Sequence, residues 1–455
     1  MENFFKLKEN HTNVRTEIIA GFTTFMTMAY ILAVNPNILS AAGMDAKAVL
    51  IATALASFVG TLLMAVLANY PFALAPGMGL NAYFAYTVVI QMGYSWQFAL
   101  FAVFVEGIIF IVLSLTNVRE AIFNAIPLTL KAAVSVGIGL FIAFIGLQDA
   151  KLIVSSDATL VTYQNFKGDT FQSVGVGAIL ALAGVLITAV LLAKQIKGGI
   201  LIGIFTTWVL GIICELAGIY VPNIDAGMYS VIPSGLISLD FSSFKETFGA
   251  VFTLDFGAVN IGDFAIIMFS FLFVDLFDTL GTLIGVSSKA NMLDENGKLP
   301  RIKPALLSDA IATCIGAVFG TSTTTTFVES ASGVTAGGRT GLTALTTAVL
   351  FLLSAIFSPL FLSIPSFAIA PALIIVGFYM MGSVAKIDFE DMTDAIPAFL
   401  CIIAMPLAYS ISEGIAIGVI SWTIINLLTG KAKEKKVSLL MYVLTILFIL
   451  KYVFL

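Results

Sequence analysis

The chain has 455 residues, of which 59% are hydrophobic and only 11% are charged, and its mean hydropathy is +1.04. Soluble domains carry about 25% charged residues, so this composition excludes a soluble globular protein and predicts a polytopic membrane protein. The net charge is -5, and no basic face with interleaved aromatic residues supports nucleic-acid binding. With one histidine, His11, and three cysteines without CxxC spacing, neither a metal site, a cofactor nor an enzyme active site is expected.

Apolar runs of membrane length predict an all-α protein with fourteen transmembrane spans. In the first half they cover 16–37, 47–69, 73–90, 97–115, 124–147, 173–193 and 198–218. In the second half they cover 263–286, 304–320, 324–338, 340–362, 367–384, 393–409 and 411–429. The apolar segment from Val437 to Leu455 is either an extra span or an interfacial helix.

The distribution of cations predicts the orientation of these spans. With the N-terminus inside, 17 of the 22 lysines and arginines fall on the inner side and four on the outer side, and Lys451 in the last apolar segment is unassigned. The connection at 219–262 is acidic, as suits an external loop. We therefore expect a multi-pass protein of the cell membrane, surrounded by lipid, with a cytoplasmic N-terminus.

The span count predicts an internal repeat. Residues 1–218 and 263–430 each hold seven predicted spans, and an odd number per half places the halves in opposite orientations. Residues 431–455 form a basic linker and the C-terminal apolar segment. Short internal similarities agree with a repeat: Gly198–Trp208 resembles Glu413–Thr423, and Ser40–Met44 resembles Ser288–Met292.

Two predicted spans, the third and the tenth, are interrupted at corresponding places in the two halves. Pro71–Tyr86 contains Pro76, Gly77 and Gly79 and then Asn81, while Thr321–Gly341 is built from threonine, serine and glycine around Glu329. Exposed hydroxyls and a carboxylate are costly in hydrocarbon, so broken helices that line a midplane binding site are predicted. The structural alternative is close helix packing at the glycines.

The eighth predicted span, Phe264–Ser288, carries two carboxylates. Asp275 and Asp278 lie three residues apart, which places them on one helical face near the middle of the membrane. The alternative is that they cap a broken neighbouring helix. Together with Glu329 they form a small set of carboxylates that is suited to carry a proton and to bind a substrate N–H group.

The remaining polar residues in the predicted spans are expected to be structural. Glu17 and Glu106 are interpreted as helix-end or packing residues, and Asp309 as a helix cap. Tyr30 either faces the cavity or packs, and Arg339 is interpreted as a cation that marks the inner side.

Four motifs together resemble the azaguanine-type purine permeases of the xanthine/uracil permease family. They are FVDLFDTLGTLIG (Phe273–Gly285), TTTTFVESASGVTAGGRTGL (Thr323–Leu342), APGMGLNAYFAY (Ala75–Tyr86) and EIIAGFTTFMTMAYILAVNP (Glu17–Pro36). The resemblance extends over nearly the whole chain. It implies fourteen spans in two inverted halves, divided into a core domain (about 16–115 plus 263–362) and a gate domain (about 124–218 plus 367–429).

The resemblance also implies a function. A purine base (hypoxanthine, guanine or adenine) is expected to enter the cell with a proton by elevator-like movement of core against gate, and the protein is expected to dimerise through the gate domain. The sequence does not rank the purines, and sodium coupling stays open. The family's carboxylates match Asp275 and Glu329, its third-span polar residue matches Asn81, and Asp278 also fits the motif.

From these residues we predict a substrate site. Glu329 and Asp275 are expected to hydrogen-bond the edge of the base, and one of Glu329, Asp275 and Asp278 to take up the proton. Asn81 and the backbone near Ser330 and Ala331 complete the pocket, and Phe327 or Tyr83 stacks on the ring.

Three other functions compete with purine transport. An anion transporter on the same inverted-repeat fold would want positive charge at the broken helices, where this chain has carboxylates. An intramembrane enzyme would need a nucleophile–base pair or metal ligands, and an ion channel would give uptake that does not saturate.

Overall fold

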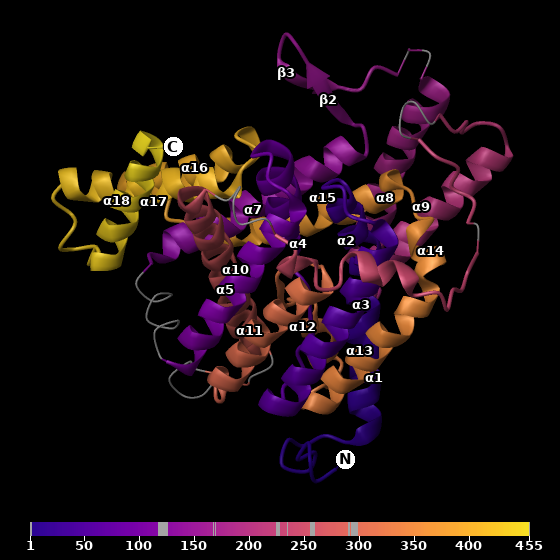
Figure 1. Cartoon of the computed structure of the whole chain (residues 1–455), viewed down its shortest axis with the longest axis horizontal. Helices are drawn as coiled ribbons and strands as arrows, with labels where there is room; N and C mark the ends of the chain where they lie inside the picture. Colours follow the sequence, from indigo (N-terminus) through magenta and orange to yellow (C-terminus); the bar gives the residue numbers. More distant parts are fainter. Residues whose placement is uncertain are drawn as a thin grey trace.

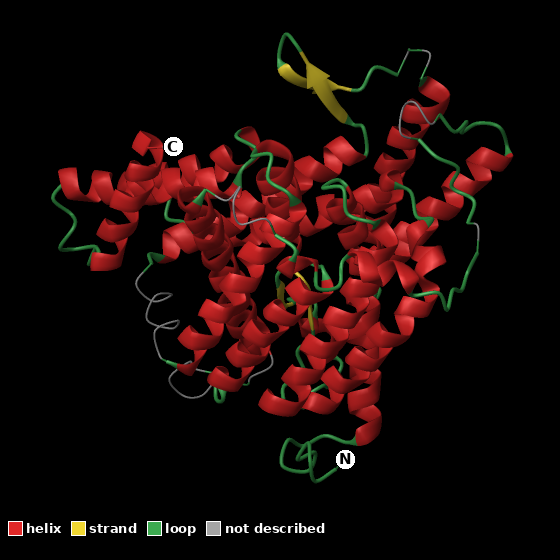
Figure 2. Ribbon diagram, in the orientation of Figure 1, coloured by secondary structure: helices red, strands yellow, loops and turns green. Residues whose placement is uncertain are grey.

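The computed structural model describes residues 2–116, 126–166, 168, 170–223, 228–233, 235–254, 260–289, 292 and 299–454. These residues form a mainly helical molecule, and in Figure 1 the N-terminus lies at the bottom and the C-terminus at the upper left. Figure 2 shows that the strands are few and short, and one hairpin projects from the edge of the molecule. The expectation of an all-helical chain is wrong for these strands alone.

The described part of the first half consists of long helices, with short helical segments after strand β1 and a β-hairpin. Its elements are α1 (Val14–Met28), α2 (Ile31–Ser40), α3 (Ala46–Leu63) with the π-helical turn η1 (Met64–Ala68), β1 (Leu74–Pro76), α4 (Met78–Ala82), η2 (Tyr83–Gln91), α5 (Trp96–Leu115), α7 (Leu128–Asp149), the hairpin β2 (Ile153–Ser156) and β3 (Leu160–Tyr163), η3 (Phe171–Gly175), α8 (Val176–Ala193) and α9 (Gly199–Leu216).

The second half follows two short 3-10 turns, η5 (Ser242–Glu246) and η6 (Ala250–Phe252). Its elements are α10 (Ile261–Lys289), α11 (Ile302–Phe319), β4 (Thr324–Thr326), α12 (Ser330–Thr335), α13 (Gly341–Ser354), η8 (Ala355–Phe357), α14 (Ser358–Leu362), α15 (Ser366–Met381), η9 (Gly382–Lys386), α16 (Met392–Leu407), α17 (Ile411–Leu428) and α18 (Leu439–Phe454).

Ten of the predicted spans are confirmed as apolar helices long enough to cross a membrane, counted over the described residues. The predicted third and tenth spans instead contain a strand followed by a short helix. The count of fourteen crossings therefore stays a prediction, as do the domain boundaries. Several charges used to predict the orientation lie outside the described residues: Arg119, Lys167, Asp225, Asp255 and Lys298.

The helices begin where a side chain caps the first free backbone N–H groups. Asp45 accepts from the N–H of Ala48 at the start of α3, and Ser95 accepts from Phe98 at the start of α5. Such caps satisfy donors that have no partner inside the helix. The helices also expose apolar side chains on their outward faces, for example Leu186 of α8, which is 68% exposed. Apolar exposed faces are expected of helices that contact lipid.

The two interrupted segments cross in the interior of the molecule as a two-stranded antiparallel sheet. The paired residues of β1 and β4 are Leu74 with Thr326, Ala75 with Thr325, and Pro76 with Thr324. Two further bonds extend the ladder: the N–H of Gly77 donates to the carbonyl of Thr323 at 2.9 Å, and the N–H of Phe327 donates to the carbonyl of Ala73 at 3.0 Å. Backbone groups without a helix would otherwise be unpaired at membrane depth.

The packing around this crossing is related by exchange of the two halves. Helix α5 packs against α11 and α10, and α13 packs in the same way against α3 and α1. Helix α7 packs against α16, and α15 packs against α8. In Figure 1, α4 and α12 lie near the centre of the molecule, at the crossing. Such reciprocal packing is what an inverted repeat produces.

The helices fall into two packing groups that meet along α7 and α15. One group holds α1, α3, α5, α10, α11 and α13 around the crossing, and the other holds α7, α8, α9, α15, α16 and α17. Helices α7 and α15 approach most closely at two glycines, because a Cβ on Gly377 would lie 2.4 Å from the carbonyl oxygen of Gly139. The alternative weighed for glycines, close packing, applies at this contact.

Asp309 of α11 stabilises the crossing by joining β4 to α10. Its carboxylate accepts from the N–H of Thr326 at 3.0 Å and from the hydroxyl of Thr279 at 2.8 Å, and its side chain is fully buried. The interpretation of Asp309 as a helix cap is wrong, because α11 already begins at Ile302.

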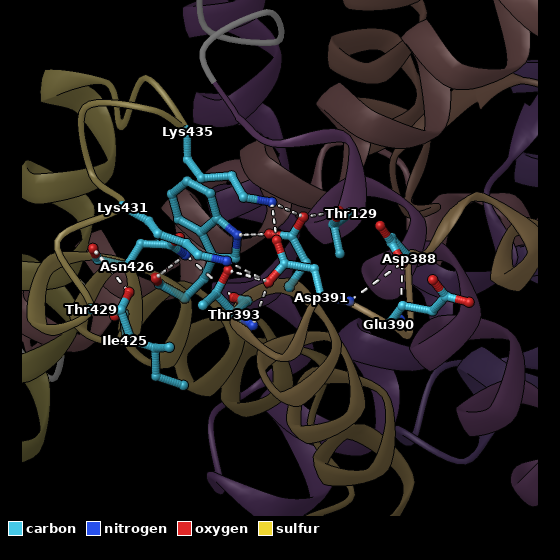
Figure 3. A network of polar contacts seen from close by, with 12 residues as sticks. Thr129, Asp388, Glu390, Asp391, Thr393, Ile425, Asn426, Thr429, Lys431 and Lys435 are labelled. Atoms are coloured by element: carbon cyan, nitrogen blue, oxygen red, sulfur yellow. Dashed lines mark hydrogen bonds and ion pairs between the residues drawn. The ribbon is translucent and has the colours of Figure 1, made fainter.

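The segment after α17 is anchored by the polar network in Figure 3. The ammonium of Lys435 lies 2.7 Å from Asp391 and 2.8 Å from Asp394, and that of Lys431 lies 3.3 Å from Asp391. The indole N–H of Trp422, on α17, donates to Asp394 at 2.7 Å. Asp391 also caps α16, so the network joins the linker to two helices.

The charges in this network persist over a wide pH range. Hydrogen bonds from Lys435 hold the pKa of Asp391 well below its usual range. Burial opposes the charge on Lys435, but its bonds to Asp391 and Asp394 outweigh that and raise the pKa of Lys435 to about 12. The stabilisation from Asp391 is present above about pH 4 and is lost as the pH falls through its lowered pKa. The stabilisation from Lys435 is complete below its ordinary value of 10.5 and is lost as the pH rises through about 12.

We expect Asp309→Ala to lower the melting temperature of the detergent-solubilised protein by several degrees. The substitution removes the acceptor of the buried Thr326 N–H, and an unsatisfied buried group costs about 1–3 kcal/mol. Size-exclusion chromatography after stepwise heating measures the change. Asp157→Ala, in the exposed turn of the β2–β3 hairpin, is the matched control. Equal melting temperatures for the two variants would contradict the stabilising role of Asp309.

We expect Asp391→Asn to make the linker several times more sensitive to trypsin, because both lysine contacts weaken. Glu246→Gln, at the exposed end of η5 and outside the network, is the control. The ratio of the cleavage rates of Asp391→Asn and the unaltered protein is measured at pH 6 and at pH 9. The ratio should be the same at both, because both groups stay charged across that range. A ratio of one would show that the network does not hold the linker.

Candidate functional site

Glu329 lies three residues after the end of β4, at the N-cap of α12, and is half-buried. The hydroxyl of Tyr30 donates to its Oε1 at 2.6 Å. Tyr30 comes from the connection between α1 and α2 and is fully buried. A phenol from the first predicted span therefore orients the carboxylate of the tenth, and because Tyr30 is fully buried its role toward a cavity stays a prediction.

Asp278 of α10 lies at the crossing beside Gly77, which directly follows β1. A Cβ on Gly77 would lie 3.5 Å from Oδ2 of Asp278 and 2.8 Å from Cγ2 of Thr325. Asp278 is half-buried and within electrostatic range of Asp309 and Glu329. The absence of a side chain at Gly77 thus lets a carboxylate come close to the backbone where β1 ends.

Asp275 lies deeper than Asp278, although both are on one side of α10. Asp275 is fully buried, and its Oδ1 accepts from the hydroxyl of Thr279 at 2.9 Å. The same hydroxyl lies 2.8 Å from Asp309 and 2.7 Å from the hydroxyl of Thr325. Thr279 thereby links Asp275 to Asp309, which supports β4, whereas Asp278 lies within electrostatic range of Glu329.

The predicted pocket residues of α4 and α12 are mostly buried in this conformation. Asn81 is fully buried, with Nδ2 at 3.4 Å from the carbonyl of Pro76, and its Oδ1 has no hydrogen-bond partner among the described residues. The hydroxyl of Ser330 accepts from the N–H of Ala73 at 3.0 Å, which ties α12 to the start of β1. Ala331 is half-buried.

The two aromatic residues predicted to stack on a substrate ring pack inside the protein. Phe327 is 5% exposed and Tyr83 is 1% exposed. The ring of Tyr83 lies edge-on to Phe271 of α10, with 4.9 Å between the centroids. Their role in binding stays a prediction.

The packing group that contains α7 and α15 also contributes residues at the edge of this site, and sequence analysis did not predict them. Tyr379 of α15 is 52% exposed and within electrostatic range of Glu329. On the side of α7, a Cβ on Gly79 would lie 2.8 Å from Ile138. The site therefore lies where the two packing groups meet. No pattern in the sequence marks Tyr379, because it stands in an uninterrupted apolar helix.

Glu17 and Arg339 hold the end of the interrupted tenth segment. Glu17 is fully buried and accepts from the backbone N–H groups of Arg339, Thr340 and Thr343 at 2.9–3.2 Å. The guanidinium of Arg339 donates to the carbonyl of Val334 at 2.8 Å and so caps α12. The helix-end role predicted for Glu17 is confirmed, but the helix end belongs to the other half of the chain.

Glu106 of α5 also supports the crossing. It is fully buried, and its Oε2 accepts from the hydroxyl of Thr323 at 3.0 Å. Within the described part of the chain, no three histidine, cysteine, aspartate or glutamate side chains gather in a metal-binding arrangement. What the geometry offers is a pair of half-buried carboxylates, Glu329 and Asp278, at a crossing of extended backbone.

The fold resembles solved membrane transporters. It matches the transmembrane domain of the cyanobacterial bicarbonate transporter BicA with a TM-score of 0.65 and 17% identity, over 88% of this chain and 97% of that chain. It matches the murine anion transporter Slc26a9 with a TM-score of 0.57 and 12% identity, over 91% of this chain and 68% of that chain. At such identities the similarity concerns the fold alone, which in these transporters is an inverted repeat.

The sequence comparisons are closer. The family model described as Permease family (Xan_ur_permease) matches residues 15–417. The guanine/hypoxanthine permease PbuO of Bacillus subtilis is 46% identical over 98% of this chain and 99% of its own length. The adenine permease AdeP of Escherichia coli is 42% identical over 100% of this chain and 96% of its own length. These relatives are transporters and not enzymes, and the full-length matches show that this chain belongs to the permease family.

Proposed function

We propose that this protein imports purine nucleobases (hypoxanthine, guanine or adenine) across the cytoplasmic membrane together with a proton. The names of the full-length relatives support the substrate class. The observation that carries the proposal is the pair of carboxylates at the crossing: Glu329, held by Tyr30 at 2.6 Å, and Asp278 beside Gly77.

The chemistry of a purine edge fits this pair. Hypoxanthine and guanine present N–H donors on both rings, and an ionised carboxylate is an acceptor that takes two such bonds. Tyr30 occupies one oxygen of Glu329 from inside the protein, which leaves the other free to face a base. A purine also carries acceptors, its ring nitrogens and carbonyl oxygen, and these need a donor on the protein.

A protonated carboxyl group supplies that donor. Because the base then binds best when one carboxyl group is protonated, binding of the base would be coupled to binding of a proton. With one of Glu329 and Asp278 protonated, the site offers both an acceptor and a donor to the base edge. A base that prefers this state raises the proton affinity of the site, and the proton raises the affinity for the base to the same extent. Two neighbouring carboxylates at membrane depth also favour holding one proton between them. Sodium as the coupling ion is the alternative.

The other predicted site residues receive distinct roles in this proposal. Asp275 acts through Thr279 and positions α10 against β4, because it is fully buried and bonded to the hydroxyl of Thr279. Asn81 and the backbone at Ser330 and Ala331 contact the base once α4 and α12 shift, with Phe327 or Tyr83 against its ring.

Transport would follow from movement between the two packing groups. We propose fourteen crossings, with the segments of β1–α4 and β4–α12 as the broken third and tenth spans. The group around the crossing is the core domain, and the group with α7 and α15 is the gate domain and the contact between two subunits of a dimer. The site at their boundary, near Tyr379 and Ile138, would be exposed to one side of the membrane and then to the other as the core moves.

We expect Glu329→Gln and Asp278→Asn each to lower hypoxanthine uptake by at least about tenfold, because each loses a charge-assisted hydrogen bond of roughly 1.5–3 kcal/mol. Uptake of radiolabelled hypoxanthine into cells that lack their own purine transport measures this, with membrane content checked by immunoblot. Glu246→Gln, on an exposed loop, is the control. Unchanged uptake by Glu329→Gln would remove it from the site.

Asp275→Asn distinguishes positioning from contact. We expect it to lower the melting temperature of the purified protein, while Asp278→Asn leaves the melting temperature unchanged and abolishes stabilisation by added hypoxanthine. The reverse pattern would return Asp275 to the direct role that the sequence suggested.

The coupling ion is tested by changing protons and sodium separately. Uptake should rise as the external pH falls from 8 to 6, collapse with an uncoupler, and stay the same when choline replaces sodium. Uptake that depends on sodium at constant pH would contradict proton coupling.

An anion transporter remains the second candidate, because the solved structures of similar fold include anion transporters. The cation of the tenth segment, Arg339, donates to the carbonyl groups of Val334 and Gly338, and the crossing itself carries carboxylates. Inhibition of hypoxanthine uptake by other purines, and not by sulfate, bicarbonate or dicarboxylates, would decide for the purine carrier.

A further inference from the structure

We infer that the C-terminal helix α18 is a further membrane crossing whose outer face is covered by lipid hydrocarbon. This places Phe454 on the opposite side of the membrane from the basic linker at 431–436. The inference concerns topology and does not depend on the identity of the substrate.

Helix α18 runs antiparallel to α17 and reaches both of its ends. It packs against α17. Near the end of α18, the hydroxyl of Tyr452 donates to Glu413, which lies in the first turn of α17. At the other end, Lys435 is bound to Asp394 beside Trp422 of α17, and α18 begins soon after, at Leu439.

The lengths of the two helices agree with this arrangement. Helix α17 has 18 residues and α18 has 16, which correspond to about 27 Å and 24 Å at 1.5 Å per residue. Helix α17 is long and apolar enough to cross the membrane. The bond from Tyr452 to Glu413 holds the end of α18 at the start of α17, and the short linker held by Lys435 joins the end of α17 to the start of α18, so the two ends of α18 lie level with the two ends of α17. A helix lying in the plane of the headgroups would meet a crossing helix at one level only.

The side of α18 that faces the protein is packed. Met441, Leu444 and Phe448 are buried, and the ring of Phe448 lies 6.0 Å from that of Phe269 on α10. Phe269 belongs to the packing group around the crossing, whereas α17 belongs to the other. Helix α18 therefore contacts both groups.

Among the described residues, the outer side of α18 carries exposed apolar side chains. Its most exposed side chains include Leu439 at 79%, Ile446 at 57% and Leu447 at 54%. An interfacial helix would carry a charged or polar face there. Lys451, one turn from the end of α18, is its one charged residue, and a mainly apolar helix that is packed on one side fits the outer layer of a membrane bundle, with hydrocarbon as the occupant. The lysines that precede it suit the cytoplasmic side.

The test compares the two ends of α18. In a variant without Cys214, Cys314 and Cys401, single cysteines are placed at Lys433→Cys in the linker and directly after Leu455, each in the full chain. Intact cells are treated with a membrane-impermeant maleimide before and after permeabilisation. Asp157→Cys, in the hairpin predicted to be external, is the control for labelling from outside, and monodisperse elution confirms that each variant folds.

We expect the cysteine after Leu455 to react in intact cells and Lys433→Cys to react only after permeabilisation. Labelling of both from the same side would overturn the inference and leave α18 on the membrane surface. A second experiment tests whether lipid or another protein copy covers the outer face of α18. Membranes that contain Leu447→Cys are oxidised with copper phenanthroline. Lipid contact predicts that the protein stays monomeric on denaturing gels, whereas a disulfide-linked dimer would show that a second copy covers this face.

Discussion

The crossing of β1 and β4 is the constraint on which the rest of the structure depends. Two chain segments leave helical geometry in the interior of a membrane protein, where water does not satisfy their backbone groups. They satisfy each other instead, through the ladder and the two flanking bonds from Gly77 and Phe327. Because the ladder maps onto itself when the two halves are exchanged, neither half can form this site without the other.

The crossing also explains why some carboxylates within the apolar segments are fully buried and others are only half-buried. Asp309 and Glu106 fix β4 through Thr326 and Thr323 and have no exposed surface. Glu329 and Asp278 lie at the ends of the paired strands, where the backbone turns back into helix and the second packing group begins. The buried carboxylates hold the geometry, and the half-buried ones remain able to meet a substrate.

Much of this could be predicted from the sequence, because composition and interruption are local properties. Ten apolar helices and the two interrupted segments followed from hydropathy, proline and glycine. The partners of the carboxylates did not follow, because they come from distant parts of the chain: Tyr30 meets Glu329 across 299 positions, and Thr326 meets Asp309 from β4. The spacing of Asp275 and Asp278 placed them on one face but not at their different depths, which depend on the packing of α11.

The central claim is that the crossing presents Glu329 and Asp278 to one purine base. An experimental structure of the protein with hypoxanthine bound tests this most directly. The account predicts density for the base beside Gly77, with Glu329 and Asp278 both within hydrogen-bond distance of its edge. A base bound away from the crossing, or held by Asp275 with Asp278 turned away, would contradict it.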